Sequence, residues 1–243
     1  MLLLCIYIKK MSVFIKKQNI NRLIKDIKSL LHTPLHDSGI YYKHDETDIL
    51  KGYALIIGPE NTPYFGGYYL FEIHYPSDYP YVPPTILYST NGEDIRFHPN
   101  LYKNRKVCLS VLNTWRGEQW TSCETISSIL LHLCMLFTKN PLLNEPGITE
   151  DHPACIPYYK IIEYKNIDIA ICNILYKKEP YYMSFFDLFY DIMYENFLKN
   201  KHKLISFVAL KNQDTCPQRL RVDLYSMYTY IDYNSLLLKI ENI

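Results

Sequence analysis

A cysteine follows a histidine by ten residues in the segment "HPNLYKNRKVCLSVLNTW", residues 98–115. As a nucleophile, Cys108 would attack a carbonyl or thioester carbon through its thiolate. As a structural thiol it would be buried, because free cysteine is among the most buried residue types. Three cations just before it, Lys103, Arg105 and Lys106, favour the thiolate. Spacing alone leaves both interpretations open.

Composition limits the class of protein. The 243 residues, 48% of them hydrophobic, suffice for one domain with an extension or for two small domains. A formal net charge of +1 gives no global attraction to nucleic acid or to an anionic membrane, so neither is expected as a partner. Seven cysteines, with no C-x-x-C pair, favour reduced thiols and thus a reducing compartment, the cytoplasm with or without the nucleus.

Residues 1–18 are expected to form a leader outside the folded domain. The apolar run Met1–Ile8 is far shorter than the about 20 residues of a membrane span. No basic segment precedes it, which argues against a signal peptide.

The first predicted element is a helix in "NINRLIKDIKSLLHTP", residues 19–34, where apolar residues recur at helical spacing. Asn19 or Asn21 is available to cap its start, and Pro34 comes soon after its end. The opposite face carries three cations, Arg22, Lys25 and Lys28.

Three β-rich runs follow, at 50–59, 68–76 and 83–90, with a turn-rich connection between the first two. The stretch "PSDYPYVPP" cannot lie in a central strand because of its four prolines. It predicts a rigid loop with a candidate cis peptide at Tyr79-Pro80 and an exposed Tyr81. A second helix is predicted at 125–137, with Thr125 as its cap. The order of helix, antiparallel strands, long loop and helix indicates an α+β fold.

Several of these segments together resemble one family. "TPYFGGYYLFEIHYPSDYPYVPP", "HPN", "KVCLSVL", a tryptophan-containing loop and a helix are similar in order and spacing to the ubiquitin-conjugating enzymes, the E2 class, over roughly residues 19–175. Within the family, "NPLLNEPG", "ISSILL" and "YIDYNSLLLKI" resemble the type Z branch. The resemblance implies a UBC fold with an N-terminal helix, a four-stranded antiparallel meander, an active-site loop and C-terminal helices.

The boundaries expected from this resemblance are a core domain at 19–178 and a helical C-terminal extension at 179–243. In the extension, residues 185–205 carry apolar residues at helical spacing, and that face must be buried somewhere.

The resemblance implies a role for Cys108 as the residue that carries ubiquitin, or a ubiquitin-like modifier, as a thioester and passes it to a lysine amine. No cofactor and no metal are implied. His98 and Pro99 would form a rigid turn, and the Asn100 amide would stabilise that turn, the oxyanion formed on attack, or both.

Two further residues match positions beside the nucleophile in the family. Tyr102 would pack against the stem of the incoming lysine, and the alternative is ordinary surface packing. Glu145 in "NEPG" would orient the amine, and the alternative is a solvated loop charge. Two departures from the common pattern are Ser110 in place of an aspartate and Arg105 in place of a glycine. If that glycine has positive φ, arginine there strains the loop by roughly 1–2 kcal/mol.

The partner surfaces are also carried over by the resemblance. The cationic helix face would contact the activating enzyme, and Tyr81 with the loop after Trp120 would contact a ligase. The ligase loop holds Thr121, Ser122 and Cys123 where Ser-Pro-Ala is usual, which predicts a restricted choice of ligase or none. Protein substrates would supply the lysine.

The sequence allows three other interpretations. A Cys-His hydrolase would need Cys108, His98 and a third group in contact. A zinc site could draw on His132, Cys134, His152 and Cys155, but their spacing is not a recognised one, and the first two favour a place in the apolar core. A non-catalytic modifier-binding protein with this fold would lack the cysteine that this chain retains.

Overall fold

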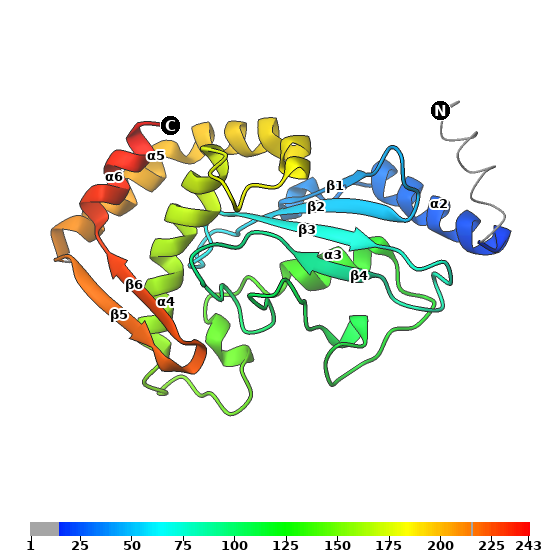
Figure 1. The fold of residues 1–243 in the computed structure, drawn as a ribbon, viewed down its shortest axis with the longest axis horizontal. Coiled ribbons are helices and arrows are strands. Elements are labelled where there is room, and N and C mark those ends of the chain that lie inside the picture. The colour runs from blue at the N-terminus through cyan, green and yellow to red at the C-terminus, as the bar shows by residue number, and fades with distance from the viewer. Residues whose placement is uncertain (1–14, 215) are drawn as a thin grey trace. The chain divides into compact units, whose positions relative to one another are not determined.

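The computed structural model describes residues 15–214 and 216–243 (Figure 1). The chain divides into two compact units. The first comprises the described residues up to Ile56 together with Leu70–Ser89 and Arg105–Leu136. The second comprises Ile57–Tyr69, Thr90–Asn104 and the chain from Phe137.

Helix α2, Lys17–His32, opens the first unit and buries one apolar face. Four of the predicted apolar residues are buried there, Ile20, Leu23, Ile27 and Leu30. Asn19 is not the cap, because the helix begins two residues earlier; its amide is buried and donates to the Ser77 carbonyl at 2.8 Å. Since Lys17 and Gln18 are helical, the leader expected at 1–18 is shorter at its C-terminal end; residues 1–14 lie outside the described part.

The sheet has four strands in the order β1-β2-β3-β4, with bounds Ile40–His44, Lys51–Ile57, Tyr68–His74 and Thr85–Tyr88. Antiparallel pairing sets Ile40 opposite Ile56 and Phe71 opposite Tyr88. β2 and β3 are buried over almost their full length, which matches their continuous β-branched and aromatic sequence. The expected meander is therefore present.

Helix α3, Ile126–Cys134, contacts α2 and ends the first unit's regular structure. Thr125 caps it as predicted: its hydroxyl accepts from the Ser128 N–H, and the Ser128 hydroxyl accepts from the Thr125 N–H. His132 is exposed and Cys134 only half-buried, so the expectation that both belong to the core is wrong. The Tyr79-Pro80 peptide is cis, as predicted.

The second unit contains helix α4, Cys155–Lys165, which continues as a π-helical segment, Asn166–Asn173. A 3-10 turn, Ser184–Phe189, leads into α5, Tyr190–Asp214. The apolar face predicted in this region is buried, with Phe185, Phe189, Met193 and Phe197 all enclosed. Its role in this chain is thus core packing.

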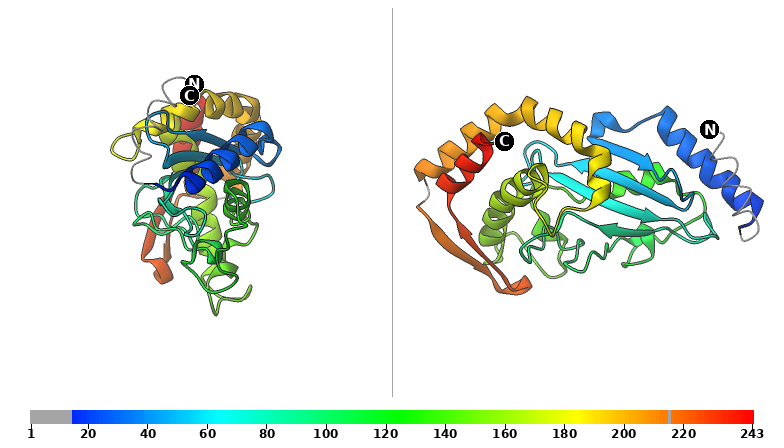
Figure 2. Two further views of the ribbon diagram at one scale, coloured as in Figure 1. Left: turned by 90° about the vertical axis from the view of Figure 1, so that its right-hand side faces the viewer. Right: turned by 45° about the horizontal axis from the view of Figure 1, so that its top comes forward.

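The extension is not purely helical, which corrects the prediction. After α5, the chain forms a two-stranded antiparallel hairpin, β5 (Gln218–Val222) and β6 (Met227–Ile231), before the final helix α6 (Tyr233–Glu241). α6 lies beside α5 (Figure 2). The turn between β5 and β6 is a short 3-10 segment, Asp223–Tyr225.

Candidate active site

Cys108 lies between β4 and α3 in the chain, in a segment whose backbone is held on both sides. Before it, Lys106 forms a β-bridge with Leu87 of β4. After it, the Leu109 N–H donates to the Thr114 hydroxyl at 2.9 Å. Cys108 is only 2% exposed. The bridge and the hydrogen bond thus hold the segment that carries the sulfur in place.

Arg105 adopts a left-handed backbone with φ of 71°, which costs a non-glycine residue roughly 1–2 kcal/mol. The strain expected from the missing glycine is thus confirmed. Its guanidinium Nη2 donates to Glu72 at 3.0 Å and to the Ser89 hydroxyl at 2.8 Å, and its Nε donates to the Tyr88 carbonyl at 3.2 Å. These contacts hold the loop against the strain. They also pair the Arg105 charge with the Glu72 carboxylate.

Glu72 of β3 is the anchor for that arginine. Its carboxylate also binds Lys51 at 2.7 Å and lies 3.0 Å from His74 Nε2. Burial acts to raise the pKa of Glu72, but the hydrogen bonds from Lys51 and Arg105 hold the pKa below its usual range. The carboxylate stays ionised and ties the Cys108 loop to the sheet.

The His-Pro-Asn turn lies in the second unit and is held by a buried imidazole. His98 Nδ1 accepts from the Asn100 N–H at 3.0 Å, and the Leu101 N–H donates to the His98 carbonyl at 2.9 Å. An Asn144 amide lies 3.3 Å from Nε2. Burial, with the Arg96 charge, lowers the pKa of His98 to about 3. The ring is neutral at physiological pH and its Nδ1 accepts from the turn backbone, which suits a turn-holding role and not that of a base.

Glu145 and Tyr102 are brought together through two residues that the sequence analysis did not single out. The Tyr225 hydroxyl donates to Glu145 Oε2 at 2.5 Å. The Arg96 guanidinium carbon lies 3.9 Å from the centroid of the Tyr102 ring and 4.4 Å from that of Tyr225. Arg96 gave only the weak signal of a cation two residues before the turn. Tyr225 gave none, because it lies in the extension.

The predicted site residues are thus divided between the two units. Cys108 lies in the first, whereas Asn100, Tyr102 and Glu145 lie in the second. Within the second unit, the turn and the Glu145 loop are linked through the pair of His98 and Asn144.

A family model described as ubiquitin-conjugating enzyme matches residues 22–154, more than half of the chain. The match includes Cys108, the His-Pro-Asn turn and Glu145. The chain belongs to the ubiquitin-conjugating enzyme family. Its helix followed by a four-stranded antiparallel sheet and C-terminal helices confirms the predicted α+β UBC fold.

Relatives place this ubiquitin-conjugating family member near the type Z branch. It is 41% identical to ubiquitin-conjugating enzyme E2 Z of Homo sapiens over 162 residues, covering 65% of this chain and 45% of the relative. The Danio rerio E2 Z is 38% identical over 186 residues, covering 75% and 55%. The human dual E2 ubiquitin-conjugating enzyme/E3 ubiquitin-protein ligase BIRC6 is 41% identical over 118 residues, covering 45% and 2%. The chain spans about half the length of the type Z relatives that it matches.

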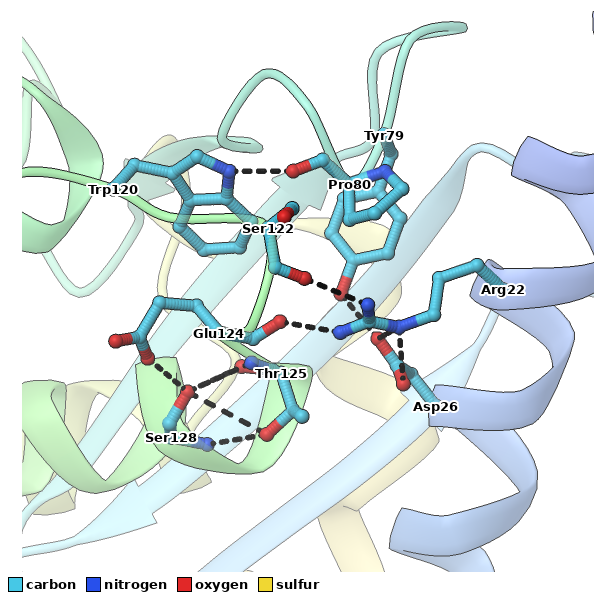
Figure 3. Close-up of polar contacts among 9 residues, drawn as sticks. All are labelled: Arg22, Asp26, Tyr79, Pro80, Trp120, Ser122, Glu124, Thr125 and Ser128. Carbon is cyan, nitrogen blue, oxygen red and sulfur yellow. Dashed lines mark hydrogen bonds and ion pairs between the residues drawn. The ribbon is translucent and has the colours of Figure 1, made fainter.

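The cationic helix face of this family member is not uniform (Figure 3). Arg22 donates from Nε to Asp26, from Nη1 to the Ser122 carbonyl at 2.7 Å and from Nη2 to the Glu124 carbonyl at 2.7 Å. These donors hold the loop before α3, and the docking role of Arg22 stays a prediction. Lys25 and Lys28 are exposed and remain candidates for docking.

The two loops predicted to meet a ligase differ in exposure. Tyr81, at the tip of the Pro-rich loop, is 65% exposed. Trp120 is only 8% exposed, and its indole N–H donates to the Pro80 carbonyl at 2.7 Å (Figure 3). Trp120 therefore supports the Pro-rich loop, and its predicted place in a ligase contact stays a prediction.

Neither a metal centre nor a membrane segment is found in the described ranges. Within residues 15–214 and 216–243, no three His, Cys, Asp or Glu side chains are grouped so that they could hold a metal ion. In the same part of the chain, no helix has both the length and the apolarity needed to cross a bilayer.

Proposed function

We propose that this chain accepts ubiquitin, or a ubiquitin-like modifier, from an activating enzyme as a thioester on Cys108 and transfers it to a lysine amine. The observation that carries the proposal is the family match over residues 22–154, which spans a cysteine, a turn asparagine and an acidic loop residue in the family's order.

Charging is a thioester exchange. The Cys108 sulfur attacks the modifier's C-terminal carbonyl carbon, which forms a new C–S bond. The bond to the activating enzyme's sulfur then breaks, and that sulfur leaves as a thiolate that takes up the proton lost by Cys108. A covalent intermediate divides one difficult transfer into two easier steps.

Discharge is an aminolysis. A neutral lysine nitrogen attacks the same carbonyl, the tetrahedral oxyanion collapses, and the Cys108 thiolate leaves while the nitrogen loses its proton. The Asn100 amide is the proposed stabiliser of the oxyanion or of its turn, and removing an oxyanion donor typically costs about 3–4 kcal/mol of barrier. Tyr102 would pack against the lysine stem, and Glu145 would orient the amine.

The partner surfaces follow from exposure. Lys25 and Lys28 on α2 are proposed to steer the activating enzyme, because exposed charges act chiefly on association. Tyr81 is proposed to contact a ligase. Thr121, Ser122 and Cys123 stand where Ser-Pro-Ala is usual in the family, which supports a restricted choice of ligase.

The test is a thioester assay with activating enzyme, ATP and modifier, run without reductant for ubiquitin and for ubiquitin-like modifiers. Wild type should gain the mass of one modifier, and reductant should remove it. Cys108→Ser should retain the modifier as an oxyester that survives reductant, since an alkoxide is a poorer leaving group than a thiolate. Cys123→Ser is the matched control because Cys123 is exposed and lies in the same unit.

The control should charge like wild type. If no modifier charges the wild-type chain, or if Cys108→Ala still charges, the proposed function is wrong. Binding of modifier without a reductant-sensitive bond would instead identify a non-catalytic modifier-binding protein.

A further inference from the structure

The turn of the C-terminal hairpin places a tyrosine on the loop that carries Glu145. Tyr225 ends the segment between β5 and β6 and is 9% exposed. Its hydroxyl donates to Glu145 Oε2 at 2.5 Å across 80 residues of sequence. A nearly buried hydroxyl aimed at one carboxylate oxygen fixes the direction of that carboxylate.

The same tyrosine is itself firmly held. Its carbonyl accepts from the Lys103 ammonium at 3.0 Å. Its ring meets Tyr158 of α4 edge-on, with centroids 5.8 Å apart. Next to it, Met227 Sδ accepts from the Arg96 N–H at 3.2 Å. Tyr225 is therefore a rigid support for Glu145.

Arg96 extends this support to the His-Pro-Asn turn. Its guanidinium stacks on both Tyr225 and Tyr102, and its Nη2 donates to the Pro99 carbonyl. One cation thus connects the hairpin, the Tyr102 ring and the backbone just before Asn100. The hairpin, far from these residues in sequence, determines how they are held.

The protonation state of Tyr225 suits a permanent donor. Burial, and then the hydrogen bond to the Glu145 carboxylate, raise the pKa of Tyr225 well above its usual value. The phenol stays protonated at physiological pH. It donates to Oε2, and in the described chain Oε1 receives no hydrogen bond, so this oxygen can accept from an incoming amine.

We propose that Tyr225 is a positioning residue for lysine discharge: the C-terminal hairpin holds Glu145 by the Tyr225 hydroxyl and, through Arg96, holds Tyr102. This rests on the proposed function, because it assigns Glu145 and Tyr102 to the second half of that reaction. Charging, and transfer to a small thiol, desolvate no amine and do not need Glu145. Only transfer to an amine should depend on the hairpin.

The test uses Tyr225→Phe, which removes the hydroxyl and keeps the ring beneath Arg96. The matched control is Tyr228→Phe on the same hairpin, where the side chain is 57% exposed. Each full-length chain is charged with ubiquitin, ATP is removed, and loss of thioester is followed after adding free lysine or 2-mercaptoethanol. Tyr225→Phe should slow discharge to lysine by about tenfold, the size typical of a hydrogen bond to a charged group. Its charging and its discharge to the thiol should match wild type.

The ratio of lysine to thiol discharge separates positioning from loss of structure. A loosened loop would change both rates, whereas positioning changes only the rate with lysine. Glu145→Gln and the double variant Tyr225→Phe with Glu145→Gln complete a double-mutant cycle. The losses in lysine discharge rate of the two single variants should be strongly non-additive in the double variant.

Equal lysine rates for Tyr225→Phe and wild type, additive losses, or an equal loss with the thiol would each overturn the inference while the proposed function stands. Failure of the wild-type chain to charge with ubiquitin or with any ubiquitin-like modifier would overturn the proposed function, and with it the inference.

Discussion

Asp26 and Glu145 each accept a hydrogen bond from a tyrosine hydroxyl, and the rest of their surroundings differ. In the first unit, the Tyr79 hydroxyl donates to Asp26 Oδ2 at 2.5 Å. In the second, the Tyr225 hydroxyl donates to Glu145 Oε2 at the same distance. Each pair joins segments far apart in sequence.

The arginine beside each pair is used differently. Arg22 binds Asp26 directly, with its Nε at 3.0 and 3.1 Å from the two oxygens (Figure 3). Arg96 instead lies over the ring of Tyr225. In the described chain, Tyr225 is the one residue that donates to the Glu145 carboxylate.

The two carboxylates therefore differ in what they can still do. Asp26 is buried and bound by both a cation and a hydroxyl, so it stabilises the fold and connects α2 to the Pro-rich loop through Tyr79. Glu145 is half-buried and oriented by one neutral donor, so it keeps acceptor capacity for a substrate amine. Similar residue types thus make one structural site and, under the proposed function, one site suited to transfer.

The largest expected effect comes from breaking the first site. Arg22→Ala should lower the free energy of unfolding by about 2–3 kcal/mol, because buried Asp26 loses its cation and two carbonyls lose their donor. Urea denaturation measures it. Lys25→Ala, one turn away on the exposed face, should change stability by no more than about 0.5 kcal/mol. Equal stability of the two variants would mean that the Arg22 contacts contribute nothing.

The second site should respond in activity and not in stability. Glu145→Gln retains an oxygen that accepts from Tyr225 and loses the charge, so discharge to lysine should fall by roughly tenfold at neutral pH. The rate should recover partly as pH rises toward the free lysine pKa of about 10.4, where more amine is neutral. Single-turnover loss of thioester measures this. Asp26→Asn is the counterpart variant, and its free energy of unfolding should fall. An equal fall for Glu145→Gln would contradict the distinction between the two carboxylates.

A third carboxylate, Glu72, extends the comparison because its partner Arg105 has a strained, left-handed backbone conformation. Arg105→Gly relieves roughly 1–2 kcal/mol of left-handed strain but loses charged hydrogen bonds of about 1.5–3 kcal/mol, and glycine adds freedom to the unfolded chain. The net result should be a loss of about 1 kcal/mol in unfolding free energy, read from denaturant midpoints. Exposed Arg116→Gly provides the control. A stabilised Arg105→Gly would show that strain outweighs the bonds to Glu72.

The smallest effect is expected for the exposed cations of α2. Lys25→Glu with Lys28→Glu should slow charging a few-fold at low salt and hardly at all at high salt, since screened surface charges contribute at most about 1 kcal/mol. Lys139→Glu with Lys199→Glu makes the same change in net charge elsewhere and should leave the rate unchanged. The measurement is the initial rate of thioester formation at two ionic strengths. Equal rates for the two double variants would show that α2 does not take part in the charging interface.

Local patterns predicted the elements of the first unit well. Helical spacing and Thr125 identified α2 and α3, and β-branched runs identified β2, β3 and β4. The start of α2 was misplaced because Asn19 has the chemistry of a cap but is drawn inward to the Ser77 carbonyl. β1 was not singled out by its own short sequence, "IYYKH", and was implied only by the family's four-stranded sheet.

The extension was predicted less well. The final stretch was expected to be helical, yet burial alternates in "MYTYI": Met227, Thr229 and Ile231 are buried and the two tyrosines between them are exposed. That alternation is the period of a strand, and the partner strand completes it. A two-stranded hairpin depends on packing for its stability, and its short runs give a weaker signal than a long helix.

The sequence by itself determined the family and most elements of the first unit, because these depend on residue type and spacing along the chain. On the same ground it singled out Cys108, Asn100 and Glu145 as the proposed site residues. Only the tertiary structure decided which way the side chains are used. It turned Arg22 inward to a loop 100 residues away, and it placed Tyr225 on Glu145 across 80 residues. Contacts of that range depend on how whole elements pack, and no local period or propensity encodes them.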